Sequence, residues 1–151
     1  MRKIETQMCA AIQANQDFKS GNTQVITIEG VSFIYLHGNQ IATVDEDSMT
    51  IYDGGWQSNT TKSRLNALCD AFCIAGEGVF QKNYKWFVRK FVGQVGTEKV
   101  FKNEEFESGY VFAWLTNRDR FVILGAVKWA PLNIKKATTL TYKGTQTVDI
   151  L

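Results

Sequence analysis

The run "TTKSR" is one of two places where residue types and spacing could support ligand binding. Thr60 and Thr61 stand at the expected start of a helix, where backbone N–H groups and the helix dipole attract phosphate. Lys62 and Arg64 follow within the first turns and add positive charge, and Trp56 precedes them. A capped helix with two cations in solvent would have the same pattern, so both interpretations stay open.

The second candidate is "KNYKWFVRKF", in which cations alternate with aromatic residues. Rings that stack on bases, beside cations that hold phosphates, are what a nucleotide or a single-stranded nucleic acid requires. Strand periodicity places Trp86 on one face, and Phe87 and Arg89 on the other. We expect Tyr84, Trp86 and Arg89 to contact the ligand. A half-buried strand of an ordinary protein has the same pattern, which is the alternative.

Catalytic chemistry has little support in the sequence. The only histidine, His37, would have to serve as the base for a nucleophile, but it ends a predicted strand before a Gly-Asn turn. The carboxylates Asp45, Glu46 and Asp47 fit a solvated loop better than a magnesium site. Neither "GEGVF" nor "GGWQ" has the spacing or the Lys-Ser/Thr ending of a phosphate loop. We therefore predict a protein that is not an enzyme and that has no cofactor and no metal.

Cysteine usage and charge indicate the compartment. Cys9, Cys69 and Cys73 are odd in number, and one histidine without spaced partners cannot complete a zinc site, so reduced cytosolic thiols are expected. A net charge of +2 is too small to argue for a polyanionic partner from total charge. No apolar run approaches the length needed to span a bilayer, and the amphipathic N-terminal segment does not resemble a signal peptide. We expect a soluble protein without a membrane partner.

The periodicity of apolar residues predicts the elements that hold these candidates. An amphipathic helix comes first, and four short strands follow between turn signals, which favours an antiparallel meander. Gly54 and Gly55 then turn the chain into a second helix, capped by Asn59, Thr60 or Thr61. The expected strands span residues 23–29, 31–37, 40–45 and 49–53, and the second helix is expected to end at Gly76 or Gly78.

The remainder reads as further β-hairpins. One is expected over residues 77–91 with a turn at Lys82-Asn83, and further strands are expected at "GYVFAWL", "RFVILGAVKW", "TTLTY" and "TVDIL". The predicted fold class is α+β: an antiparallel β-meander with an N-terminal helix and a helix inserted after the fourth strand, followed by further hairpins. A chain of 151 residues fits one domain, here a core over 1–91 and a β-rich extension over 92–151. Its aromatic residues and edge strands favour a homo-oligomer.

Several motifs together resemble a known group. "FKSGNTQV" at 18–25, "YLHGNQIA" at 35–42, "GGWQSNTTKSRLNAL" at 54–68 and "GVFQKNYKWFV" at 78–88 occur in this order. On these motifs residues 1–91 resemble small proteins of unknown function that tailed bacteriophages encode. The layout of a sheet, an inserted helix and more strands is also similar in outline to the phage proteins that sequester cyclic ADP-ribose signals of the Thoeris defence.

The resemblance implies a viral protein that works in the host cytoplasm, where small phage proteins without enzymatic activity often bind and disable a host component. The expected function is therefore counter-defence, by binding a host defence protein or its nucleotide signal. A single-stranded nucleic-acid-binding protein that uses the hairpin face is one alternative. A structural or assembly protein of the virion is the other.

Overall fold

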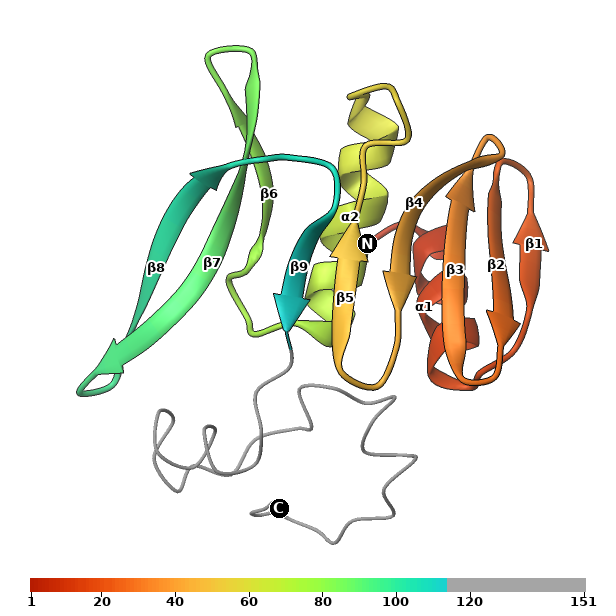
Figure 1. The fold of residues 1–151 in the computed structure, drawn as a ribbon, viewed down its shortest axis with the longest axis horizontal. Helices are drawn as coiled ribbons and strands as arrows, with labels where there is room; N and C mark the ends of the chain where they lie inside the picture. Colours follow the sequence, from red (N-terminus) through yellow and green to blue (C-terminus); the bar gives the residue numbers. More distant parts are fainter. Residues whose placement is uncertain (114–151) are drawn as a thin grey trace, which may run out of the picture.

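The computed structural model describes residues 1–113 (Figure 1). The predicted elements in this range occur in the predicted order, together with two strands that were not predicted, at 18–20 and 98–105. The predicted strands "RFVILGAVKW", "TTLTY" and "TVDIL" lie outside the described residues. Two helices and nine strands are arranged in the described part, which confirms the α+β class with an N-terminal helix, a meander and a helix after it. The elements are α1 (Lys3–Gln13), β1 (Phe18–Ser20), β2 (Thr23–Ile28), β3 (Val31–Leu36), β4 (Asn39–Val44), β5 (Ser48–Ile51), α2 (Asn59–Phe72), β6 (Gly78–Lys82), β7 (Lys85–Val95), β8 (Glu98–Glu105) and β9 (Tyr110–Ala113).

The large sheet is six-stranded and antiparallel, in the order β1-β2-β3-β4-β5-β9. Five of its strands form the meander, and β9 joins the edge of β5 after the chain has passed through α2 and the second sheet. Strand alternation gives the sheet one fully buried face: Ile34 and Leu36 of β3 are buried, whereas Phe33 and Tyr35 are half-buried.

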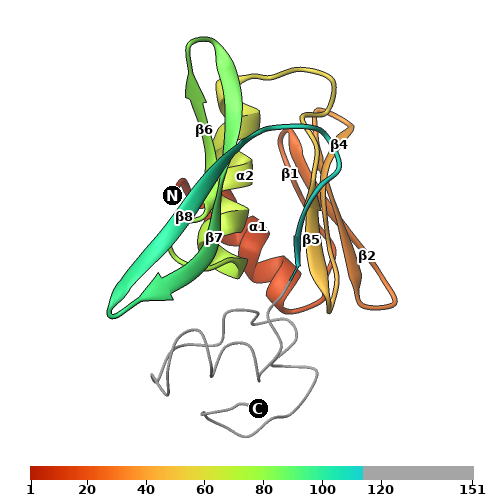
Figure 2. The same ribbon diagram turned by 60° about the vertical axis from the view of Figure 1, so that its left-hand side comes forward.

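The small sheet has the order β6-β7-β8 and lies on the other side of the helices (Figure 2). Trp86 and Val88 of β7 point into the same buried cluster as α2 and the large sheet, so one core joins both sheets. The edge of β6 is closed by Asn66 of α2, whose side chain donates to and accepts from the backbone of Val79, at 2.8 Å in each case. A side chain at Gly78 would collide with that amide.

The start and the end of α2 differ from those expected from the sequence. Ser58 caps α2, because its hydroxyl accepts from Thr61 N–H at 3.1 Å; the expected caps Asn59, Thr60 and Thr61 lie inside the helix. The helix ends at Phe72, before the expected glycines. The glycine bend is confirmed, with positive φ at both Gly54 and Gly55.

Two further details of the strands correct the sequence reading. Strand β1 is a short edge strand that was not predicted from the sequence. The turn of the second hairpin is at Asn83-Tyr84, one residue beyond the predicted position. Strand β7 continues through residue 91, and β8 and β9 complete the two sheets, so residues 92–113 belong to the same packed body as the segment before them.

Candidate functional site

Arg64, expected to bind an anion, is buried inside the fold and has only 3% of its surface exposed. Its Nη1 donates to Glu5 Oε2 at 2.7 Å, and its Nε donates to Thr23 Oγ1 at 3.0 Å. Its Nη2 donates to Asn22 Oδ1 at 3.3 Å. The guanidinium therefore ties α2 to α1 and to the start of β2, and it does not face solvent at the start of α2.

Glu5 is held as a carboxylate by the groups that surround it. Burial alone would raise its pKa, but hydrogen bonds from Ser63 Oγ, from Arg2 backbone N–H and from Arg64 together place the pKa of Glu5 below its ordinary value. This arrangement completes a buried ion pair that connects the two helices, and it uses the positive charge that an incoming anion would otherwise meet.

Thr61 and Trp86, which were also predicted to bind a ligand, are buried. Thr61 is 4% exposed, and its hydroxyl lies 3.0 Å from that of Ser58, within the cap of α2. Trp86 is 3% exposed and packs edge-to-face on Phe106, with 5.4 Å between ring centroids. Arg64 and Trp86 are therefore not accessible to a ligand on the surface. The sequence places both residues on plausible faces but does not give their partners, which lie 59 and 20 positions away.

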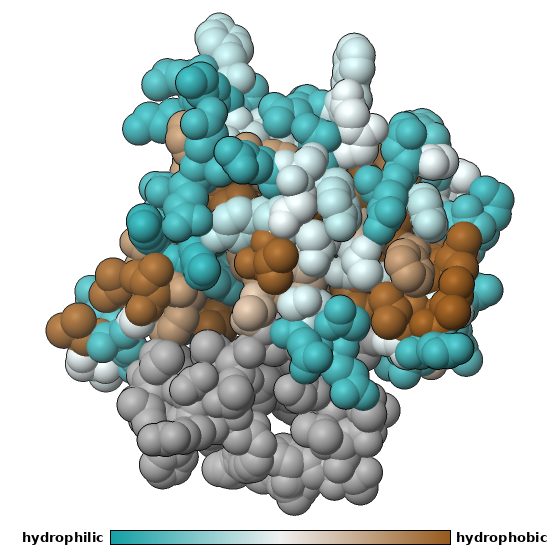
Figure 3. All heavy atoms as spheres, in the orientation of Figure 1, coloured by the Kyte–Doolittle hydropathy of each residue, from teal (hydrophilic) through white to brown (hydrophobic). Residues whose placement is uncertain are grey.

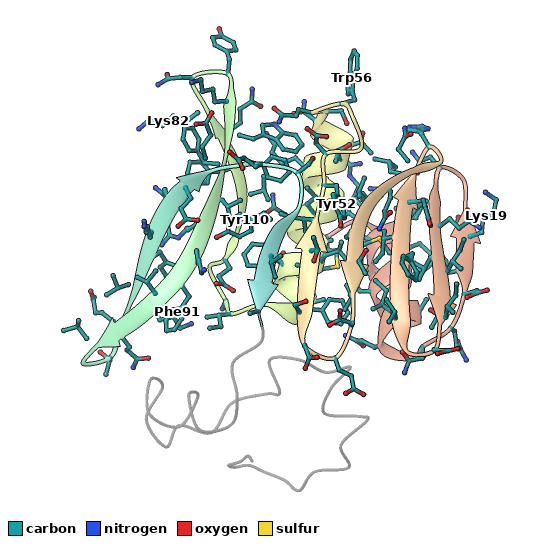
Figure 4. All side chains as sticks on the ribbon, viewed as in Figure 1. Lys19, Tyr52, Trp56, Lys82, Phe91 and Tyr110 are labelled. Carbon is teal, nitrogen blue, oxygen red and sulfur yellow. The ribbon has the colours of Figure 1, made fainter. Side chains whose placement is uncertain are left out.

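Two aromatic side chains remain exposed at one end of the molecule: Trp56 is 75% exposed in the loop between β5 and α2, and Tyr84 is 95% exposed in the turn between β6 and β7. We call this pair the aromatic tips. The loop and the turn project from the same end in both ribbon views, and Trp56 points outward with Lys82 across from it (Figure 4). The outline of the surface dips between the two projections (Figure 3).

Cations lie around the aromatic tips. Lys62 of α2 is half-buried, and its Nζ donates to Gln81 Oε1 of β6 at 3.2 Å, which links the helix to the hairpin. Lys82 and Lys85 flank the turn of the hairpin and are exposed. Thr60 is half-buried in the first turn of α2. Of the predicted residues, this end of the molecule thus brings together Trp56, Thr60, Lys62 and Tyr84.

The two tips are held in different ways. The loop of Trp56 is fixed by Asp53, whose Oδ1 accepts from Gly55 N–H at 2.8 Å and whose carbonyl oxygen accepts from Trp56 N–H at 3.2 Å. Tyr84 instead sits in a tight turn with φ of +64°, after Asn83 with φ of +53°. A bulky residue in that left-handed conformation is unusual. Glycine is the residue that such a hairpin turn favours at this position.

A second aromatic group, which we call the outer face, lies on the side of the small sheet that points away from the core. Phe80 of β6 and Phe87 of β7 stack with ring centroids 5.6 Å apart. Arg89, which is exposed, lies over the ring of Phe101 of β8 at 4.2 Å. Arg89 and Phe87 were predicted to share a face, but Phe80 and Phe101 join them only through strand pairing, which no local pattern reveals.

The chain matches one protein family over the whole of its described part. Residues 1–113 match the family described as Kyanoviridae Gp96 protein. The chain belongs to this bacteriophage family. No curated protein and no solved structure gives a significant match. The match to the Gp96 family continues past residue 91, where the sequence resemblance was expected to stop, and it includes β8, β9, both aromatic tips and the outer face.

The cysteines, the histidine and the possible metal ligands were also considered as candidates for chemistry in the part of the chain that the structure describes. Cys9, Cys69 and Cys73 are buried free thiols, and burial raises the pKa of Cys9 to about 12. His37 is exposed in the turn between β3 and β4. Within residues 1–113, no group of three or more His, Cys, Asp and Glu side chains could hold a metal ion. In the same range no helix has the length and apolar content to cross a bilayer.

Proposed function

We propose that this phage protein acts stoichiometrically, by binding and neutralising a component of the host cell, and that it catalyses no reaction of its own. The binding surface in this proposal is the end of the molecule that carries the aromatic tips. Membership of a bacteriophage family supports a role in the infected host. The partner is inferred from the chemistry of the exposed side chains.

Tyr84 is the observation that carries the proposal. A side chain in the left-handed region costs roughly 1–2 kcal/mol relative to the usual helical region, and the ring is 95% exposed, so it returns almost no packing energy. Folding alone would favour glycine at this position. A residue that conflicts with its local structure, and is not compensated within the fold, is typical of a functional position.

The aromatic tips favour a protein partner. Tryptophan and tyrosine are the side chains most enriched among the residues that dominate binding energy at protein interfaces. Trp56 and Tyr84 come from separate segments with a depression between them, which suits a surface broader than one nucleotide. The alternative partner, a nucleotide signal at the start of α2, has less support because Arg64 is already paired with Glu5. We therefore favour a host defence protein over its nucleotide signal.

A pull-down from uninfected host lysate tests the proposal. Tagged wild-type protein, Trp56→Ala, Tyr84→Gly and the control Lys19→Gln are each incubated with lysate, with and without nuclease. We expect the same host protein to be retained by wild type and by Lys19→Gln after nuclease treatment, and to be lost from both tip variants. Lys19 is an exposed residue of β1, at the far edge of the large sheet, so its variant controls for a general change of surface (Figure 4).

Calorimetric titration separates the two kinds of partner. Cyclic nucleotides and ADP-ribose derivatives are titrated into the wild-type protein, and we expect no binding heat. Saturable heat that persists in Trp56→Ala and Tyr84→Gly would overturn the choice of a protein partner. Retention of the same host protein by all four baits would overturn the assignment of the surface.

A further inference from the structure

We propose that the outer face of the small sheet is a binding site for single-stranded nucleic acid. This site adjoins the aromatic tips at Lys82 and Lys85, but it includes neither Trp56 nor Tyr84 and does not depend on the function proposed for them. It is formed by β6, β7 and β8, and the register of these strands places residues of neighbouring strands side by side on this face.

The rings of the outer face supply stacking surface. Phe80, Phe87 and Phe101 are half-buried, so part of each side chain remains accessible. Phe80 and Phe87 stack on each other with an interplanar angle of 21°, which aligns two rings on neighbouring strands. The guanidinium of Arg89 lies over Phe101. Proteins that bind single strands stack unpaired bases on phenylalanine rings and on the planar guanidinium groups of arginine. This stacking has no strong sequence preference.

The charge of this face is positive. Strand alternation and the register place Lys82, Lys85, Arg89 and Lys99 on the same side as the phenylalanines. From these three strands the same side receives one carboxylate, Glu105. It lies 3.9 Å from Lys85 Nζ, and four cations against one carboxylate leave a net charge of +3 on this side. Cations therefore outnumber anions on a face whose net charge the overall +2 of the chain does not reveal.

The length of the charged face distinguishes a polymer from a mononucleotide. Lys85 and Arg89 are four residues apart on β7, which is about 14 Å along a strand. Lys82 of β6 lies directly across from Lys85, and Lys99 extends the row beyond Phe101 on β8. One nucleotide cannot reach cations spaced in this way, whereas an extended strand of several nucleotides can. A duplex would leave the rings without a partner, because its bases are already stacked in the helix interior.

Fluorescence anisotropy with a labelled oligothymidine 12-mer tests this site, in buffers from 50 to 300 mM salt. If three or four cations contact phosphates, the logarithm of the association constant should fall against the logarithm of salt with a slope of about −2 to −3. The double variant Lys82→Gln/Lys85→Gln should lower that slope by about 1.4 and weaken binding. The charge-matched control Lys3→Gln/Lys19→Gln, in α1 and β1, should bind as wild type does.

The rings require their own variant, because a cationic surface alone can retain oligonucleotides. Phe80→Leu/Phe87→Leu keeps apolar bulk on the strands and removes both rings, and circular dichroism on heating confirms that it folds. We expect a loss of affinity of at least about fivefold with an unchanged salt slope. Absence of binding by wild type at 50 mM salt, equal binding of a duplex of the same length, or equal effects of the two lysine pairs would each overturn the proposal. Trp56→Ala should leave oligonucleotide binding unchanged, which separates this site from the aromatic tips.

Discussion

The start of α2 and the turn between β6 and β7 contain similar residue types but use them differently. At the start of α2, the cation Arg64 has three hydrogen-bonding partners outside the helix and almost no exposure. At the turn, Tyr84 is almost fully exposed, in a backbone conformation that suits glycine better. The comparison shows that a charged side chain beside a helix start belongs to the fold when its partners are buried. An aromatic ring that strains the backbone and packs on nothing requires a different explanation.

The largest expected effect comes from breaking the buried pair. Arg64→Met leaves the carboxylate of Glu5 buried without its cation, and removal of one partner from such a pair costs roughly 3–5 kcal/mol. Urea denaturation followed by circular dichroism measures the free energy of unfolding. A loss below about 1 kcal/mol would mean that Arg64 is free to serve a ligand, and the contrast with Tyr84 would disappear.

A matched double variant controls for the change in shape. Glu5→Gln/Arg64→Met removes both charges, so the penalty for an unpaired buried carboxylate is absent. We expect it to be more stable than Arg64→Met alone. If the two variants were equally unstable, lost packing would explain the effect better than the ion pair.

The same pair predicts a dependence of stability on pH. Because the pKa of Glu5 is lower in the folded protein than its ordinary value of 4.5, the carboxylate adds stability above that value. This contribution is lost as pH falls through the lower, folded pKa. The difference in unfolding free energy between wild type and Glu5→Gln should therefore be constant from pH 7 to about 5 and shrink below pH 4.5.

Glu77 also titrates in the acidic range but does not affect this comparison. Burial raises the pKa of Glu77, so its own contribution changes with pH in the opposite direction. Both proteins contain Glu77, and its contribution cancels in the difference between them. A difference that grows toward pH 3 would contradict the assignment of Glu5 as the stabilising carboxylate.

The sequence predicted the elements better than it predicted their contacts. Periodicity located both helices and most strands, because an apolar stripe at the helical period and alternation in strands are local properties. It could not show that Arg64 meets Glu5 across 59 positions, or that Phe101 joins Phe87 through a strand that follows a bulge in β7. It also missed β1, whose three residues are too few for alternation to be visible.

For the candidate site, too, the sequence indicated the local elements better than the contacts between them. Trp56 was selected because it precedes the cations at the start of α2, and Tyr84 because it alternates with cations in the second hairpin. Both lie in turns, which are on the surface. Trp86 was placed on the correct strand, but its face of the strand is the buried one. Alternation separates the two faces of a strand and does not say which of them meets the core. Lys62 meets the hairpin through its hydrogen bond to Gln81, 19 positions away, which no local pattern reveals.

The smallest expected effect on stability is also the sharpest test of the contrast. Tyr84→Gly removes a side chain from the left-handed region, which relieves roughly 1–2 kcal/mol of strain, while the added flexibility of glycine in the unfolded chain returns roughly 0.5–1 kcal/mol. We expect a net gain of about 0.5–1 kcal/mol in the free energy of unfolding, measured by urea denaturation beside wild type. Asn83→Gly, at the preceding turn position, is the control, and its gain should be smaller because asparagine tolerates positive φ. If Tyr84→Gly destabilised the protein, the ring would be contributing to the fold after all, and its exposure would no longer argue for a partner. A variant that folds more stably than wild type and yet fails to capture its partner would show that residue 84 is tyrosine because of what it binds.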